Sequence, residues 1–435
     1  MSKNNSLKRE FRLVDAVAAI VGAVIGAGIF RVPATIAAIL PDTKLILLAW
    51  LVGGVLCFCG ALTFAELSSR HPKTGGEYVY LREAYGKPFS FIYGWTLFLV
   101  IRAGSLAGIA YIFGEYLIYF LPNLSLDVRL CGIGCVAILS LINFLGVKYG
   151  RNIQRLFSLL KVLLLVGIII IGFVLGGSAS DPTLISSVVI KNPMNAFGMA
   201  LIFILWTYGG WNEAVYIGGE VKKPEKNLPK AILLGISSLT VLYILVNWAF
   251  LHVLTPAEIS ETPVVASEMM RRIVGSNGGL IIAAIILLTT FGSMNTAVLS
   301  DARIGYAVGR DHPLISFLGK LHTRFRTPGY ALLVNAVWVS VLIISGSFES
   351  LITYTATAFW FFMAMTGICL FVFRKREKSN EAPFKSWAYP LPTMLFIGMC
   401  LYLLVNTLLN SPLQSLIGLG IALLGVPVYL LSKLK

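Results

Sequence analysis

The sequence predicts an all-α integral membrane protein with about twelve transmembrane helices. Of its 435 residues 57% are hydrophobic and only 13% are charged, which is more apolar surface than one soluble core needs. Apolar runs of roughly 20 residues, the length that crosses a bilayer core about 30 Å thick, recur along the whole chain. Helices are favoured over a barrel because strand-like alternation is weak and lipid offers no partner to open backbone groups.

The apolar runs divide the chain into expected spans, all within a single membrane domain over 1–435. Residues 1–13 are expected to be cytoplasmic, spans one to five occupy 14–176, spans six to ten occupy 195–373, and the last two occupy 388–432. The individual spans are expected at 14–39, 45–67, 88–120, 128–146, 154–176, 195–219, 230–254, 277–305, 329–346, 350–373, 388–409 and 413–432.

The basic residues indicate the topology. A net charge of +15 could suggest a nucleic-acid binder, but Lys and Arg stand at the ends of apolar runs and gather in alternate loops. By the positive-inside rule both termini are cytoplasmic. The protein is expected in the cell membrane, with the lipid bilayer as its partner and no nucleic acid bound. A short helix is expected in segment 68–88, at the cytoplasmic face of the membrane. The loop with Glu258, Glu261 and Glu268 is expected to be the main feature on the outer side.

The cysteines lie inside or at the edges of apolar runs, where we interpret them as small packing residues. No disulfide, metal site or cofactor is therefore expected, and the apolar runs contain no catalytic pair that would predict an enzyme. The six are Cys57, Cys59, Cys131, Cys135, Cys369 and Cys400.

Two apolar runs are interrupted by glycine at their centres. The first run contains Gly26-Ala27-Gly28, and the sixth contains Tyr208-Gly209-Gly210. If 14–176 and 195–373 are structural repeats, the two interruptions are equivalent, and the repeats are inverted because each has five spans. Broken helices at equivalent places in two halves predict a transport site at the bilayer midplane.

The interruptions predict which groups a substrate would carry. A break in the first span exposes the N–H groups of Ala27, Gly28 and Ile29 at the start of a half-helix, and such an end binds a carboxylate. Carbonyls near Val24 and Ile25, with those of Trp206 and Thr207 in the sixth span, can accept from an ammonium group. One ligand with both groups is an α-amino acid. The alternative for the first span alone is a helix-packing surface.

Two further residues are candidates for gating or coupling. Trp206 could close the site from outside or could be core packing. Lys161 lies in a long apolar run and could extend toward Arg155 and the interface. It could instead link span five to the broken first span and to span eight near Ser293, or carry a proton.

Three intramembrane charges are functional candidates by default. Glu213 could line the cytoplasmic exit or carry a proton, and a helix–helix hydrogen bond is the alternative. Arg31 lies about one turn beyond the first break, and Arg102 lies in the third span, with the same two interpretations.

Short motifs in order along nearly the whole chain resemble the amino acid, polyamine and organocation (APC) transporter superfamily, within it the L-type (LAT/Asc-like) amino acid exchangers. No single motif decides this; their order and spacing do. They are Gly26-Ala27-Gly28-Ile29-Phe30, Phe64-Ala65-Glu66-Leu67, Gly75-Gly76-Glu77-Tyr78, Tyr85-Gly86, Ile101-Arg102, Lys161, Tyr208-Gly209-Gly210-Trp211-Asn212, Asn227-Leu228-Pro229, Phe291-Gly292-Ser293-Met294-Asn295 and Gly425-Val426-Pro427-Val428-Tyr429.

The resemblance implies the leucine-transporter-like 5+5 inverted repeat with broken helices 1 and 6. It implies sodium-independent, usually one-for-one exchange of neutral L-amino acids by alternating access. It also implies site roles: carboxylate binding at Ala27 and Gly28, amine binding by carbonyls near Val24, Trp206, Thr207 and Gly209, gating by Trp206, a family lysine at Lys161, and a polar residue near the site at Asn212.

The chain departs from the family in three ways. Animal members join a glycoprotein heavy chain through a cysteine between spans three and four; 122–128 contains none, so a self-sufficient bacterial transporter is expected. Ala27 replaces a common serine. Arg31 and Glu213 match no common family residue, which leaves a proton-coupled amino acid symporter as the alternative to exchange. The particular amino acids and the oligomeric state stay open.

Overall fold

The computed structural model describes residues 12–71, 75–123, 125–146, 151–177, 192–212, 215, 221–377 and 382–432. The regular elements of these ranges are all helices. In chain order they are α1 (Leu13–Val24), α2 (Gly28–Ile39), α3 (Thr43–Arg70), α4 (Gly76–Tyr85), α5 (Lys87–Thr96), the π-helix η1 (Leu97–Arg102), α6 (Ala103–Phe120), α7 (Val128–Phe144), α8 (Arg151–Val174), α9 (Pro193–Thr207), α10 (Pro224–Val253), α11 (Pro256–Glu261), α12 (Val265–Val274), α13 (Ser276–Asp311), the 3-10 helix η3 (Pro313–Gly319), α14 (Gly329–Ser345), α15 (Phe348–Arg376), α16 (Leu391–Asn410) and α17 (Pro412–Ser432).

The predicted all-helical membrane fold is confirmed at the level of its helices. Eight described helices are long and apolar enough to cross a bilayer, and nine spans result if the bent pair α1 and α2 counts as one. Helices α7, α9 and α14 are apolar but shorter, with 17, 15 and 17 residues. Length and composition therefore give fewer spans than the twelve expected.

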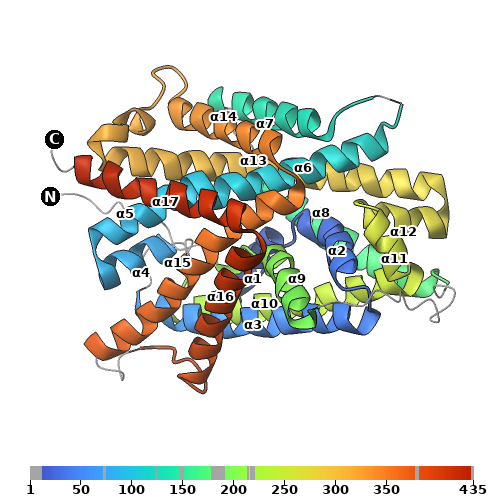
Figure 1. Ribbon diagram of the computed structural model, residues 1–435, viewed down its shortest axis with the longest axis horizontal. Helices are drawn as coiled ribbons and strands as arrows, with labels where there is room; N and C mark the ends of the chain where they lie inside the picture. Colours follow the sequence, from blue (N-terminus) through green and yellow to red (C-terminus); the bar gives the residue numbers. More distant parts are fainter. Residues whose placement is uncertain are drawn as a thin grey trace.

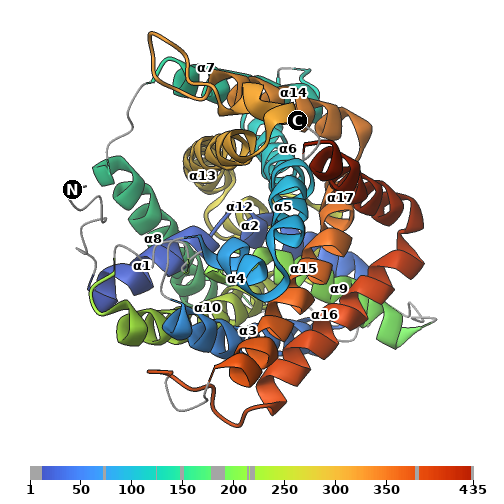
Figure 2. The same ribbon diagram turned by 90° about the vertical axis from the view of Figure 1, so that its left-hand side faces the viewer.

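The long helices run between two ends of the molecule. In Figure 1, α4 and α5 lie at the left end and α11 and α12 at the right end, and we call these the α4 face and the α12 face. Seen from the α4 face (Figure 2), α7 and α14 lie on the opposite side of the molecule from α3 and α10. α3 packs along α10, and α10 packs against α1.

The predicted interruption of the first span is present. α1 ends at Val24, Ile25 has an extended backbone, and α2 begins at Gly28 with its axis bent by 49° from that of α1. α8 lies beside this broken span: a Cβ on Gly22 of α1 would lie 2.7 Å from Ser158 of α8. The first span and α8 are therefore in close contact just before the break.

The third apolar run is one continuous rod that contains a π-helical segment, η1. A π turn disturbs the regular backbone hydrogen bonds, and such segments are frequent at functional sites. Side chains of other helices supply donors here: Trp338 Nε1 and the Tyr354 hydroxyl donate to the Leu99 carbonyl at 2.6 and 3.1 Å. The irregular turn is thus held by α14 and α15.

Both predicted non-spanning features are present. α4 is the short helix expected in segment 68–88, and α11 and α12 form the loop with the three glutamates. Glu258 caps α11 by accepting from Thr255 and also pairs with Arg272 of α12. The Arg272 guanidinium lowers the pKa of Glu258 from 4.5 to about 2, so this contact between α11 and α12 stays ionised at ordinary pH.

A buried carboxylate ties the α4-face ends of two long helices. Glu66 of α3 is fully buried and accepts from Arg70 and from Arg374 of α15, as well as from the Ser386 backbone N–H. A buried carboxylate is stable only when its charge and lone pairs are matched in this way. The motif Phe64-Ala65-Glu66-Leu67 is therefore a structural joint between α3 and α15.

Candidate substrate site

The first break presents backbone donors. Gly28 and Ile29 are the first residues of α2, so their N–H groups have no partner one turn earlier. Among the described residues, none accepts a hydrogen bond from the N–H groups of Gly26, Ala27, Gly28 or Ile29. Four adjacent donors at the positive end of a half-helix are suited to a carboxylate.

The second break presents backbone acceptors. α9 ends at Thr207, and Tyr208 to Gly210 form a turn in which Gly209 N–H donates to the Trp206 carbonyl at 2.9 Å. Gly210 has φ +107°, a conformation that favours glycine. Carbonyls at the end of a helix lack internal donors. The predicted interruption after Thr207 is therefore present, and it exposes groups that attract an ammonium ion.

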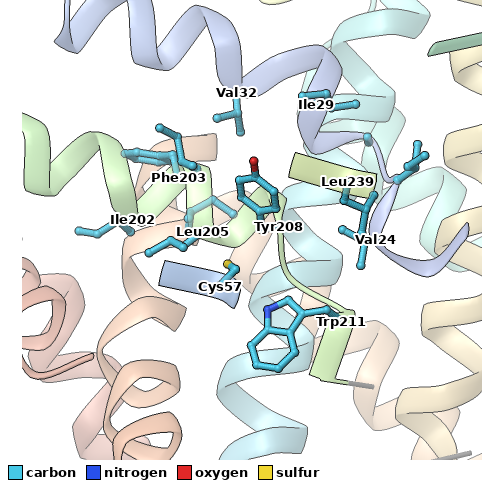
Figure 3. Close-up of a cluster of buried hydrophobic side chains, with 14 of the residues drawn as sticks. Val24, Ile29, Val32, Cys57, Ile202, Phe203, Leu205, Tyr208, Trp211 and Leu239 are labelled. Atoms are coloured by element: carbon cyan, nitrogen blue, oxygen red, sulfur yellow. The ribbon is translucent and has the colours of Figure 1, made fainter. Parts of the chain in front are cut away.

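The two breaks lie against each other. A Cβ on Gly28 would lie 2.9 Å from Trp206 Cζ3 and 3.2 Å from Thr207 Oγ1, and a Cβ on Gly210 would lie 3.6 Å from the Ala23 carbonyl. Figure 3 shows Val24 and Ile29 from the first break in the same buried cluster as Tyr208 and Trp211 from the second. Gly28 has to be glycine because the indole occupies the space that a side chain would need.

A tyrosine that sequence reasoning missed joins the two breaks. The hydroxyl of Tyr243, a fully buried residue of α10, lies 3.0 Å from the Val24 carbonyl and 3.4 Å from the Thr207 carbonyl. These are two of the carbonyls expected to bind the amine. An aromatic residue inside an apolar run gives no sequence signal beyond packing, so the hydroxyl could be found only from the structure.

Trp206 lies beside the first break and packs against α6 and α15. Its Nε1 donates to Ser105 Oγ at 3.3 Å, and its ring meets Phe348 of α15 edge-on with centroids 5.6 Å apart. Together with the contact at Gly28, these neighbours hold the indole over the break. Both predicted alternatives, a gate and core packing, are compatible with these contacts, and the gating role stays a prediction.

Lys161 lies close to the site without the bonds that were expected. It is one turn beyond Ser158, 7% exposed, and forms no hydrogen bond or ion pair with any residue in the described part of the chain. Ser293 donates instead to the Thr289 carbonyl of its own helix at 2.9 Å. The link from Lys161 to Ser293 is therefore not formed in this structure.

Asn212 follows the second break and contacts α4. Its Nδ2 donates to Oε1 of the buried Glu77 at 2.6 Å. The predicted polar residue thus anchors the chain beyond the break to the α4 face. Glu213 lies outside the described residues.

A comparison with known families identifies the class of protein to which the chain belongs. A family model described as "Amino acid permease" matches residues 11–430. The chain belongs to the amino acid permease family. It is a multi-pass membrane transporter of amino acids and not an enzyme.

Named relatives of the permease agree with this assignment. It is 32% identical over 431 residues to the serine/threonine exchanger SteT of Bacillus subtilis (strain 168), covering 98% of each chain. It is 32% identical over 425 residues to the b(0,+)-type amino acid transporter 1 of Rattus norvegicus, covering 94% of this chain and 85% of that one. It is 31% identical over 445 residues to the large neutral amino acids transporter small subunit 2 of Mus musculus, covering 98% and 81%.

The remaining predicted charges of the permease have partners. Arg102, the last residue of η1, lies 4.0 Å from the buried Asp301 of α13, a contact between the third run and α13. Arg31 of α2 binds Glu115 of α6 and Glu349 of α15 at 2.8 and 3.0 Å. Sequence reasoning did not pick out Glu115 or Glu349, although a glutamate inside the expected span 88–120 was a signal for the former.

Proposed function

We propose that the permease moves neutral L-amino acids across the cell membrane of a bacterium by sodium-independent exchange. The observation that carries this is the proximity of two sets of backbone groups: the N–H groups of Gly26 to Ile29, which have no acceptor among the described residues, and the carbonyls of Val24 and Thr207. These backbone groups match the carboxylate and ammonium that all α-amino acids share. Around them Ser105, Trp206 and Tyr243 are uncharged, which favours a neutral side chain.

The relatives support exchange as the mode. SteT is named a serine/threonine exchanger, and similarity to it extends over nearly the full length of both chains. The binding site of an exchanger changes sides only with substrate bound, so uptake requires amino acid on the opposite side of the membrane. We infer the same coupling here.

We propose a twelve-helix topology in which α7, α9 and α14 also cross the bilayer. With α1 and α2 as one span and α5 to α6 as another, the segments 14–176 and 195–373 become inverted repeats of five spans, followed by 388–432. The positive-inside rule then places the α4 face in the cytoplasm and the α12 face outside. We further propose that the transporter needs no disulfide-linked partner, because 122–128 lacks cysteine.

A competition panel tests the proposal. The purified protein in proteoliposomes preloaded with L-serine should take up labelled L-serine, and unlabelled neutral L-amino acids should compete while acidic and cationic ones should not. Uptake should require internal amino acid and should be unchanged when sodium is replaced by choline. Uptake that depends on sodium, or that is equally fast into empty vesicles, contradicts the proposal.

The second candidate is a proton-coupled symporter, and Lys161 favours it. An ionisable side chain that is buried in a span and has no partner in the described part of the chain is a candidate proton carrier. Under this alternative, empty proteoliposomes should accumulate amino acid when the outside is acidified, and Lys161→Met should abolish the accumulation. Strict exchange predicts no accumulation.

A further inference from the structure

A cavity of about 220 Å³ lies next to α11, on the side of the α12 face. Its polar lining comes from α2, α6, α11 and α15: Arg31, Thr35, Glu115, Ser260 and Glu349. A larger cavity of about 500 Å³ shares Thr35, Ala38 and Glu349 with it, so the two cavities are neighbours. Since one water takes about 30 Å³ of liquid, the smaller cavity has room for about seven groups of that size, the scale of a small amino acid.

Arg31 has two carboxylate partners, and Glu115 holds it more firmly than Glu349 does. Its Nε contacts both oxygens of Glu115 at 3.0 and 2.8 Å, and Nη1 donates to Thr35 Oγ1 at 2.9 Å. Nη2 reaches Glu349 through a single bond of 3.0 Å, and Glu349 also accepts from Thr35 Oγ1 at 3.2 Å. The Glu115 side chain is 8% exposed and that of Glu349 42%. Glu115 is therefore the fixed partner, and Glu349 is the one that can leave.

A chain of side-chain contacts links Arg31 to the first break. Its guanidinium lies over the Phe348 ring at 4.8 Å, Phe348 meets Trp206, and Trp206 lies on Gly28. These three contacts connect the cavity lining to the first break. The ion pair between α2 and α15 holds the two helices whose residues support the indole.

We propose that this cavity is a docking site for a zwitterionic α-amino acid, at which the substrate replaces the Arg31–Glu349 ion pair. The substrate carboxylate binds Nη2 of Arg31 in place of Glu349, and the substrate ammonium group binds the Glu349 carboxylate. Neither charge is left unpaired, which would be the main cost of opening the pair. Glu115 keeps the guanidinium oriented throughout. The proposal rests on an amino acid being the transported solute.

Protection of a cysteine in the cavity tests the docking site. Ala38 is exposed and lines both cavities, so Ala38→Cys gives a reactive thiol there. Cys131→Ser removes the one native cysteine that is not buried. We expect L-serine to slow modification of the purified full-length protein by a membrane-impermeant thiol reagent at least threefold. Half of the full protection is expected near 1 mM L-serine, which corresponds to a binding free energy of about 4 kcal/mol.

The variants separate docking from the central site. Adding Glu349→Gln should abolish protection, whereas Glu261→Gln, an exposed carboxylate on α11, should leave it unchanged. Protection should survive Gly28→Leu, which disables the central site. If Glu349→Gln does not fold, Glu349→Asp is the substitute, because its shorter reach should weaken protection at least threefold.

Three results overturn the proposal: no protection by L-serine, protection that survives Glu349→Gln, or protection that is lost with Gly28→Leu. The first two can occur in a protein that still exchanges amino acids. Failure of the proposed function has a different signature, since the unmodified protein would then take up no amino acid of the panel.

Discussion

Removal of one hydroxyl from α10 tests whether the two breaks act as a unit. Tyr243→Phe keeps the ring and its packing against Trp50 and Tyr208, with centroids 5.7 and 5.0 Å away. It removes the donor that lies 3.0 Å from the Val24 carbonyl and 3.4 Å from the Thr207 carbonyl. Only the shorter of these has the length of an ordinary hydrogen bond.

The expected magnitude follows from the Val24 carbonyl. A buried acceptor that loses its donor costs about 1–3 kcal/mol, and the free energy of unfolding should fall by that amount. The same contact sets the distance between the breaks, so the exchange rate should fall as well, about tenfold for each 1.4 kcal/mol. Thermal unfolding and labelled L-serine exchange in proteoliposomes measure the two effects.

Tyr208→Phe is the matched control. The Tyr208 hydroxyl is also buried and donates to the Trp50 carbonyl at 3.3 Å, within the unbroken helix α3. Because this contact is longer than an ordinary hydrogen bond and the Trp50 carbonyl keeps its donor within α3, the variant should cost less free energy of unfolding than Tyr243→Phe and leave exchange within about twofold of the unmodified protein. Wild-type exchange in Tyr243→Phe, or equal slowing in both variants, would refute the reasoning.

Three further predictions follow from single side chains. Gly28→Ala puts a Cβ 2.9 Å from the neighbouring indole and should reduce uptake at least tenfold, whereas the nearest atom to a Cβ at Gly26 is 3.7 Å away, so Gly26→Ala should leave thermal stability unchanged. Lys161→Met removes a buried amine and should preserve or raise thermal stability while uptake falls; retained uptake would exclude a role in transport. The low pKa of Glu258 means that its contact with Arg272 stabilises the fold fully above about pH 4.5 and is lost as the pH falls toward 2; hydrogen exchange of α11 should show this, and Glu258→Gln should not.

The sequence was sufficient for features that glycine or charge marks in an apolar background. Both helix breaks and the short helix α4 follow from such marks. A cluster such as Gly26-Ala27-Gly28 stands out because helix-breaking residues are rare at the centre of a span. Each of these features depends on the residues of one segment alone, so each could be predicted from that segment.

Features that depend on two distant segments could not be found in the same way. Tyr243 resembles any aromatic residue in a span until its hydroxyl is seen between Val24 and Thr207. The partners of Arg31 are 84 and 318 residues away along the chain. A single sequence contains no information on which distant helices face each other, and the expected contact of Lys161 with Ser293 was absent for the same reason.

The π-helical segment η1 has a consequence for how this chain can vary. A π turn contains one residue more than an α turn, and deletion of that residue would rotate everything after it by about 100° about the helix axis. Glu115 lies thirteen residues beyond Arg102 on the same rod, so the deletion would carry its carboxylate away from Arg31. Among homologues, the length of the segment Leu97–Arg102 should therefore vary together with the residue type at position 31, although the two lie in different helices.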